Sequence, residues 1–176
     1  MTKKQLVQLI REGLDLDHDV LEIYELTKHG GMWYTDNAES MTEITPAIDS
    51  YLNYFKNNAL YMRNNLPAQL YRFVCVNKQA AEHILAHGYT LQDRYESFSK
   101  DRNVDIHCNV SGEIRLMITL QTNTLGNTKI FDISAYDADP EGILELQGGE
   151  LSDYQWEQEV LIRGPLTIKH VELADV

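Results

Sequence analysis

The 176 residues suit a single domain, because a chain of this length buries roughly two-thirds of its unfolded surface and needs no disulfide or metal to form a core. With 15 Lys and Arg against 27 Asp and Glu, the formal net charge of -12 repels nucleic-acid backbones and favours basic partners. Acidity that serves only solubility is the simpler alternative.

The start of the chain and its two cysteines suggest a cytoplasmic protein. The polar first residues lack the apolar region of a secretory signal peptide, and no apolar run is long enough for a membrane helix. Cys75 and Cys108 lie in apolar, strand-like runs, which favours buried free thiols over a disulfide. A reducing compartment follows from that interpretation. We therefore expect a cytoplasmic location, in the protein's own cell or in a host's.

Helical patterns fill the first third of the chain. Apolar residues at helical spacing predict helices over residues 4–13 and 19–30. Thr45 and Pro46 predict the start of a longer helix, as its cap and its first residue. The expected buried stripe of that helix is Ile48, Tyr51, Leu52 and Phe55.

Strand patterns dominate the rest. The short, apolar and aromatic segment Leu70–Val76 is typical of a strand, and Asn77 can cap a helix that ends at Gly88. A long acidic stretch separates Ala135 from Trp156. The other predicted strands are residues 95–99, 114–120, 130–134, 157–162 and 166–171. Helices first and strands afterwards indicate an α+β domain, with helices packed on a mostly antiparallel sheet.

Two apparent metal motifs fail on inspection. The alternating aspartates of residues 15–19 resemble the start of a calcium loop, but Val20 occupies the obligatory glycine position. His83 and His87 have the spacing of a zinc pair, yet the glutamate that would act as base is missing between them. The sequence therefore favours no metal chemistry.

Polar residues interrupt two of the predicted strands. Arg72 stands inside an apolar strand, and its planar guanidinium suits a phosphate. An ion pair with one of the chain's own carboxylates is the alternative. Ser97 and Ser99 lie on one face of a second strand. They could hold a carboxylate by hydrogen bonds, or they could be ordinary exposed serines.

A third segment carries two glutamates two positions apart. Glu157 and Glu159 stand on one face of a strand, roughly 7 Å apart, and at an effective dielectric of about 20 they repel by roughly 2.4 kcal/mol. That repulsion is a cost unless cationic groups arrive beside them or the strand end is solvated. The apolar continuation Val160–Ile162 argues that the strand enters the core.

These three motifs, occurring together and in this order, resemble those of the arginine-specific mono-ADP-ribosyltransferases. The resemblance spans about residues 45–172, and Glu-Gln-Glu-Val-Leu-Ile at residues 157–162 looks most like the small bacteriophage enzymes of that family, with bacterial toxins next. It implies N-terminal helices packed on a mostly antiparallel, split β-sheet. It also implies one domain, with a helical lead-in over residues 1–44 and a catalytic core over residues 45–176, that uses NAD and no metal.

The resemblance implies a role for each residue. Glu159 would be the catalytic glutamate, bound to the nicotinamide ribose, and Ser97 would orient it. Arg72 would hold the NAD phosphates and shape the nicotinamide pocket. Glu157 would receive and activate the target guanidinium. The resemblance further implies that Tyr71, Phe73 and Ser99 contact NAD. Ser99 would also support the turn after its strand. Tyr154 and Trp156 would contact the protein substrate.

We therefore expect transfer of ADP-ribose from NAD to arginine side chains of basic target proteins, with release of nicotinamide. The same chemistry with water as acceptor would make the protein an NAD glycohydrolase, but water needs no guanidinium receptor such as Glu157. A nucleic-acid acceptor conflicts with the acidic charge, although an RNA acceptor stays open. A catalytically silent binding protein of the same fold is the remaining alternative. No membrane partner is expected.

Overall fold

A computed structural model describes residues 38–103, 108, 110–135 and 158–174. The two predicted N-terminal helices and most of the acidic stretch lie outside these residues. So do three predicted site residues, Tyr154, Trp156 and Glu157.

The described part of the chain holds three α-helices: α4 (Ala38–Tyr54), α5 (Lys56–Asn64) and α6 (Lys78–His87). The Asn77 side chain caps α6 by accepting from the amide of Ala80 at 2.9 Å, and Gly88 follows the helix with a φ of 91°, both as the sequence predicts.

The predicted start of α4 at Thr45 and Pro46 is wrong. The helix begins at Ala38, so Pro46 lies inside it. The Thr45 hydroxyl donates to the carbonyl of Met41 at 2.7 Å, one turn back, and does not cap the helix. The expected buried stripe of Ile48, Tyr51, Leu52 and Phe55 is confirmed, and buried Met41 and Ile44 extend it upstream. Packing of this longer stripe outweighs the local preference of proline for a first turn.

Six strands form the main sheet in the order β5-β6-β3-β1-β4-β8, and every pairing among the described residues is antiparallel. They are β1 (Gln69–Val76), β3 (Tyr95–Ser99), β4 (Ile114–Gln121), β5 (Ile130–Asp132), β6 (Glu159–Arg163) and β8 (Val171–Leu173). A separate ribbon pairs β2 (Tyr89–Leu91) with β7 (Leu166–Ile168). The α+β class and the mostly antiparallel sheet are thus confirmed.

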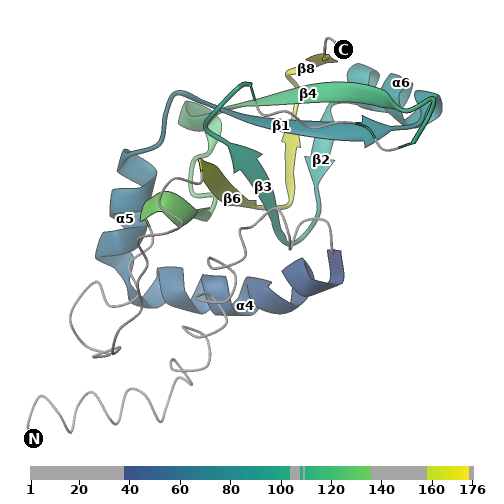
Figure 1. The fold of residues 1–176 in the computed structure, drawn as a ribbon. Helices are drawn as coiled ribbons and strands as arrows, with labels where there is room; N and C mark the ends of the chain where they lie inside the picture. Colours follow the sequence, from purple (N-terminus) through teal and green to yellow (C-terminus); the bar gives the residue numbers. More distant parts are fainter. Residues whose placement is uncertain (1–37, 104–107, 109, 136–157, 175–176) are drawn as a thin grey trace, which may run out of the picture.

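The single strand expected over residues 166–171 is instead two strands. The first, β7, pairs with β2, and the second, β8, pairs with β4 (Figure 1). The chain changes sheets between them, at Lys169 and His170. Continuous apolar patterning cannot reveal such a change of partner, because it depends on distant segments.

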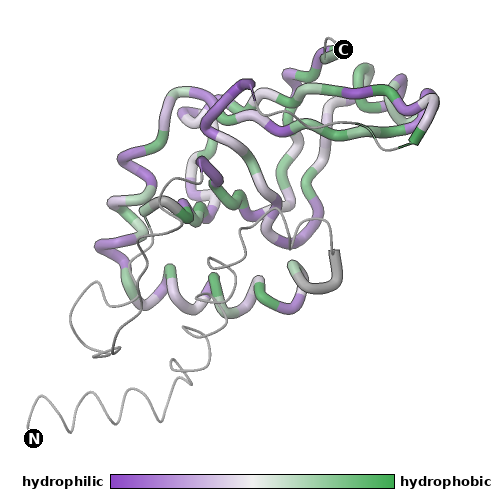
Figure 2. The backbone as a smooth tube through the Cα atoms, viewed as in Figure 1, coloured by the Kyte–Doolittle hydropathy of each residue, from purple (hydrophilic) through white to green (hydrophobic). Residues whose placement is uncertain are grey.

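The strands β3, β5 and β6 bury side chains on both faces. On one face, Tyr95, Phe131 and Leu161 pack with residues of α4 and α5. On the other, Phe98 and Val160 join the apolar side chains of β1 and β4. This division follows the two-residue period of a strand, which sends neighbouring side chains to opposite faces. Figure 2 shows hydrophobic residues recurring among hydrophilic ones along α4.

Cys75 and Cys108 form a disulfide, so the prediction of free thiols is wrong. Cys75 belongs to β1, and Cys108 to the connection between β3 and β4. Their Cα atoms lie 5.5 Å apart although 33 positions separate them in sequence, a proximity that only the fold creates. The inference of a reducing compartment loses its basis. Within the described residues, no helix combines the length and the apolar character that crossing a membrane requires.

Candidate active site

The neighbouring strands β3 and β6 bring Ser97 and Glu159 into contact. Ser99 stands directly opposite Glu159, and Ser97 stands opposite Leu161, so Ser97, Ser99 and Glu159 share one face. Ser97 Oγ donates a hydrogen bond to Glu159 Oε1. Both residues are only 8% exposed. The structure therefore contains the hydroxyl–carboxylate contact that the sequence led us to expect.

Ser99 stabilises the turn that follows β3. Its Oγ accepts from the amide of Asp101 at 2.9 Å, and the Asp101 carboxylate accepts in turn from the amide of Asn103 at 2.8 Å. The amide of Lys100 donates to the carbonyl of Gln158 at 2.7 Å, just before Glu159. These contacts fix the ends of β3 and β6 where the candidate carboxylate stands.

Arg72 reaches this pair through the main chain. Its Nη1 donates to the carbonyl oxygen of Ser97 at 2.7 Å, while its Nη2 lies 3.4 Å from Glu96 Oε2. Because Glu96 and Ser97 are adjacent in a strand, their side chains point to opposite faces. The guanidinium therefore lies on the Glu96 side of β3, and the carbonyl of Ser97 links it to the Glu159 side. The ion pair with the chain's own carboxylate, the alternative considered for Arg72, is present.

Glu96 is a residue that the sequence reasoning missed. It is 2% exposed, and its Oε1 accepts from the amide of Gln92 at 2.7 Å. Its Oε2 accepts from the Tyr89 hydroxyl at 2.9 Å and faces Arg72. A glutamate between Tyr95 and Ser97 in a buried strand was the available signal, since an isolated buried carboxylate requires partners. Glu96 is the counter-charge of Arg72.

Tyr89 completes this group on the Glu96 side. Its ring lies 5.9 Å from the Arg72 guanidinium, measured from ring centroid to Cζ. Burial raises the pKa of Tyr89 above its ordinary value of 10.0, and the charge of Glu96 acts in the same direction, whereas Arg72 opposes both. The phenol therefore stays protonated and continues to donate to Glu96.

The two residues that flank Arg72 differ in their surroundings. Tyr71 is directly opposite Ser99, so it shares the face of Ser97 and Glu159, and its hydroxyl donates to the Gln69 side chain at 2.8 Å. Phe73 instead packs under the Arg115 guanidinium, with 4.4 Å between Cζ and the ring centroid. Of the two implied NAD contacts, Tyr71 is the nearer to the candidate carboxylate in the sheet.

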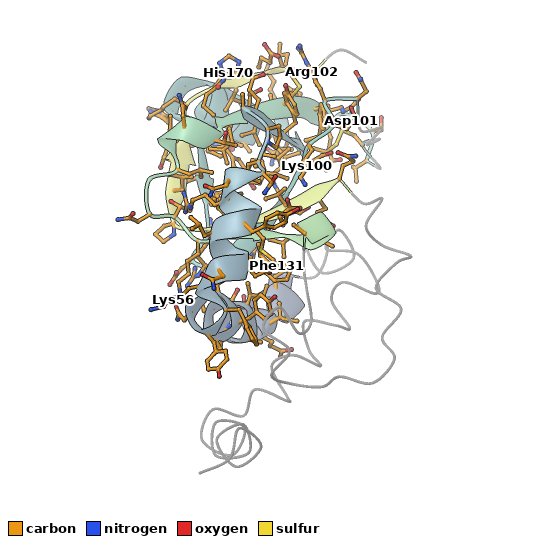
Figure 3. The ribbon with its side chains drawn as sticks, turned by 90° about the vertical axis from the view of Figure 1, so that its left-hand side faces the viewer. Lys56, Lys100, Asp101, Arg102, Phe131 and His170 are labelled. Carbon is orange, nitrogen blue, oxygen red and sulfur yellow. A yellow bond between two sulfur atoms is a disulfide. The ribbon has the colours of Figure 1, made fainter. Side chains whose placement is uncertain are left out.

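A second ion pair stands beside the site. Lys100 Nζ bonds both carboxylate oxygens of Asp132, at 2.8 and 2.7 Å, and the Asp132 side chain is 1% exposed. Asp132 belongs to β5 and lies opposite Val160 of β6. The ion pair of Lys100 with Asp132 therefore links the end of β3 to β5 across β6. In Figure 3, Lys100 lies below Asp101 and above Phe131.

Of the four residues with implied catalytic roles, the structure joins Ser97 with Glu159 directly. The Arg72 guanidinium contacts the Ser97 carbonyl from the other side of β3 and does not share the face of Glu159, and Glu157 lies outside the described residues. Comparison with protein-family models, with curated proteins and with solved structures yields no match. The functional assignment therefore rests on the residues and contacts given above.

Proposed function

We propose that the protein cleaves NAD and transfers the ADP-ribose to arginine side chains of target proteins, with release of nicotinamide. The observation that carries this proposal is the hydrogen bond from Ser97 of β3 to the buried Glu159 of β6. Arg72 binds the main chain of the same serine, from the other side of β3. A carboxylate fixed in this way is what the first chemical step demands.

That first step develops positive charge on the nicotinamide ribose as its bond to nicotinamide breaks and the bonding electrons leave with nicotinamide. A carboxylate already oriented by a hydrogen bond stabilises this charge without reorganising. Each 1.4 kcal/mol of such stabilisation accelerates the reaction about tenfold. We assign this role to Glu159, and we assign its orientation to Ser97.

Arg72 has two tasks under this proposal. Its hydrogen bond to the Ser97 carbonyl positions the main chain that carries the Ser97 hydroxyl. Its contact with Glu96 is long, at 3.4 Å, and leaves room for competition. An NAD phosphate can exchange with Glu96 for the guanidinium, because phosphate accepts the bidentate geometry that arginine offers.

Arginine requires activation before it can attack the ribose, since its guanidinium stays protonated. We assign to Glu157 the docking of that guanidinium and the acceptance of its proton as the new carbon–nitrogen bond forms. This assignment rests on the Glu-x-Glu resemblance alone, and the variants below test it separately from Glu159.

The decisive experiment incubates the purified protein with labelled NAD and a cell lysate. Label attached through bonds that neutral hydroxylamine cleaves is expected, whereas hydroxylamine-resistant label would exclude arginine. We expect Glu159→Gln to abolish NAD cleavage and transfer alike. Glu157→Gln should lose transfer and keep some NAD hydrolysis. Glu82→Gln, at an exposed position of α6, is the matched control and should behave as wild type.

The other outcomes identify the alternatives. Release of nicotinamide without labelled protein would favour an NAD glycohydrolase. NAD binding without cleavage would favour a silent binding protein. Small and equal effects of Glu157→Gln and Glu159→Gln would contradict the division of roles between the two glutamates.

A further inference from the structure

The disulfide lies against a third side chain that can bind a metal. Three ligand atoms lie within 4.8 Å of one another, one each from Cys75, Cys108 and Glu113. All three residues are half-buried. Cys75 comes from β1, Cys108 from the β3–β4 connection, and Glu113 from the residue before β4. The fold therefore brings together two sulfurs and a carboxylate that are distant in sequence.

The Glu113 carboxylate has no ion-pair partner among the described residues. No hydrogen bond or ion pair joins its carboxylate to any residue in that part of the chain, although its amide donates to the carbonyl of Val110 at 3.2 Å. The nearby Arg115 guanidinium stacks on the Phe73 ring, with 4.4 Å between Cζ and the ring centroid. A half-buried carboxylate loses hydration beside a neutral disulfide, and a cation between it and the sulfurs would offset that cost.

We propose that the reduced protein binds one zinc-like divalent ion through Cys75, Cys108 and Glu113. A tetrahedral zinc ion takes thiolate sulfur at about 2.3 Å, which separates two sulfurs by roughly 3.8 Å. The two sulfurs, bonded to each other in the disulfide, must move apart to this separation once reduced, and the Glu113 ligand atom lies within 4.8 Å of both. Thiolates select zinc over magnesium or calcium, which prefer oxygen ligands. Three protein ligands leave the fourth position to water.

Disulfide and metal are mutually exclusive states of the same two sulfurs. Reduction breaks the sulfur–sulfur bond and yields two thiols, either with a dithiol that becomes a disulfide or with a phosphine and water that become the phosphine oxide. Binding of the ion then releases both thiol protons, because the thiolate is the ligand. Oxidation by a disulfide such as oxidised glutathione re-forms the sulfur–sulfur bond and expels the ion. The inference does not depend on the proposed enzymatic function.

The test titrates zinc into the reduced full-length chain, freed of reductant without air, against a chromophoric chelator. We expect one ion per reduced chain and none in the oxidised protein at the same site. Cys75→Ser and Cys108→Ser should each abolish this binding. Glu113→Gln should weaken it at least about tenfold with both thiols intact, and Glu172→Gln, a more exposed glutamate of β8, should not.

A second pair of potential ligands requires its own control. His83 and His87 stack on α6 with ring centroids 4.6 Å apart, and they could bind zinc weakly. The double variant His83→Ala, His87→Ala should leave the redox-dependent ion in place. The proposal is overturned if the reduced wild type, with two titratable thiols, binds no ion. It is equally overturned if binding survives the cysteine variants or is unchanged by Glu113→Gln.

Discussion

Ser97 contributes a single buried hydroxyl to Glu159, and its removal should therefore affect one contact. A hydrogen bond to a charged group contributes roughly 1.5–3 kcal/mol. Under the proposed function, Ser97→Ala should lower kcat for NAD cleavage about 10- to 100-fold, with little change in KM. Steady-state assays of nicotinamide release would measure both. Ser97→Thr keeps a hydroxyl and should retain most activity; equal losses in the two variants would contradict an orienting role.

Glu96 and Arg72 should be energetically coupled, because each is the other's counter-charge in a largely buried setting. The Arg72 side chain is 18% exposed and that of Glu96 is 3% exposed. We expect Glu96→Gln and Arg72→Gln each to lower the free energy of unfolding by about 1–3 kcal/mol. The double variant should lose about 1 kcal/mol less than the sum of the two. Urea denaturation of the four proteins measures this, and strict additivity would contradict the ion pair.

The sequence predicts the residues of the candidate site better than their partners. The spacing of Ser97 and Ser99 was sufficient to expect that these two share a face, because that depends only on the strand period. That Glu159 lies on the same face follows from the register of β3 with β6. The side of β3 on which Arg72 lies depends on where β1 pairs with β3, which no local pattern specifies. Glu96 was missed for the same reason, since its burial follows from Tyr89 and Arg72 in other strands.

At the level of elements, Asp49 joins α4 to the sheet. Its carboxylate accepts from the Tyr95 hydroxyl at 2.8 Å and lies 3.0 Å from Lys129 Nζ and 3.6 Å from Arg163 Nε. Burial raises the pKa of Tyr95 far above 10.0, and the charge and hydrogen bond of Asp49 act in the same direction, while Arg163 opposes them. The helix is thus attached through a phenol that must stay protonated.

This attachment predicts a loss of stability in alkali. Above about pH 10 the unfolded chain releases the Tyr95 proton while the folded chain retains it, so the free energy of unfolding falls as the pH rises. Tyr95→Phe should cost about 1–2 kcal/mol at neutral pH and show a shallower decline between about pH 9 and 11. Urea denaturation at each pH measures the difference. Tyr61→Phe, at an exposed position of α5, should follow wild type; parallel curves for Tyr95→Phe and wild type would refute the mechanism.

Elements that depend on neighbouring residues were predicted from the sequence, whereas those that depend on distant segments were not. The buried stripe of α4 and the capped helix α6 depend on helical spacing and one side-chain cap, and the sequence predicted both. The start of α4 was misplaced because packing of Met41 and Ile44 extends the helix past a proline. The division of residues 166–171 into β7 and β8 depends on β2 and β4 as partners, which the segment itself does not encode.

On the scale of the whole molecule, the main sheet consists of two halves that meet at the candidate site. The half formed by β1, β4 and β8 joins the half formed by β3, β5 and β6 at a single register pair, Tyr71 with Ser99. In Figure 1, β3 and β6 run at a steep angle to β1 and β4. The hydrogen bond from Arg72 to Ser97 crosses the same junction. Contacts that hold the two halves together therefore also shape the site.

The disulfide anchors the connection between β3 and β4 to β1, since Cys108 lies in that connection and Cys75 belongs to β1. In the chain-entropy model, a cross-link over the 33-residue separation stabilises the fold by about 3.7 kcal/mol. Reduction should therefore lower the free energy of unfolding by about 3–4 kcal/mol. Urea denaturation with and without a phosphine measures this, in a chelator so that no bound metal offsets the loss. The double variant Cys75→Ala, Cys108→Ala should have the free energy of unfolding of the reduced wild type, and the phosphine should not change it. A wild type equally stable in both redox states would contradict a stabilising role for this cross-link.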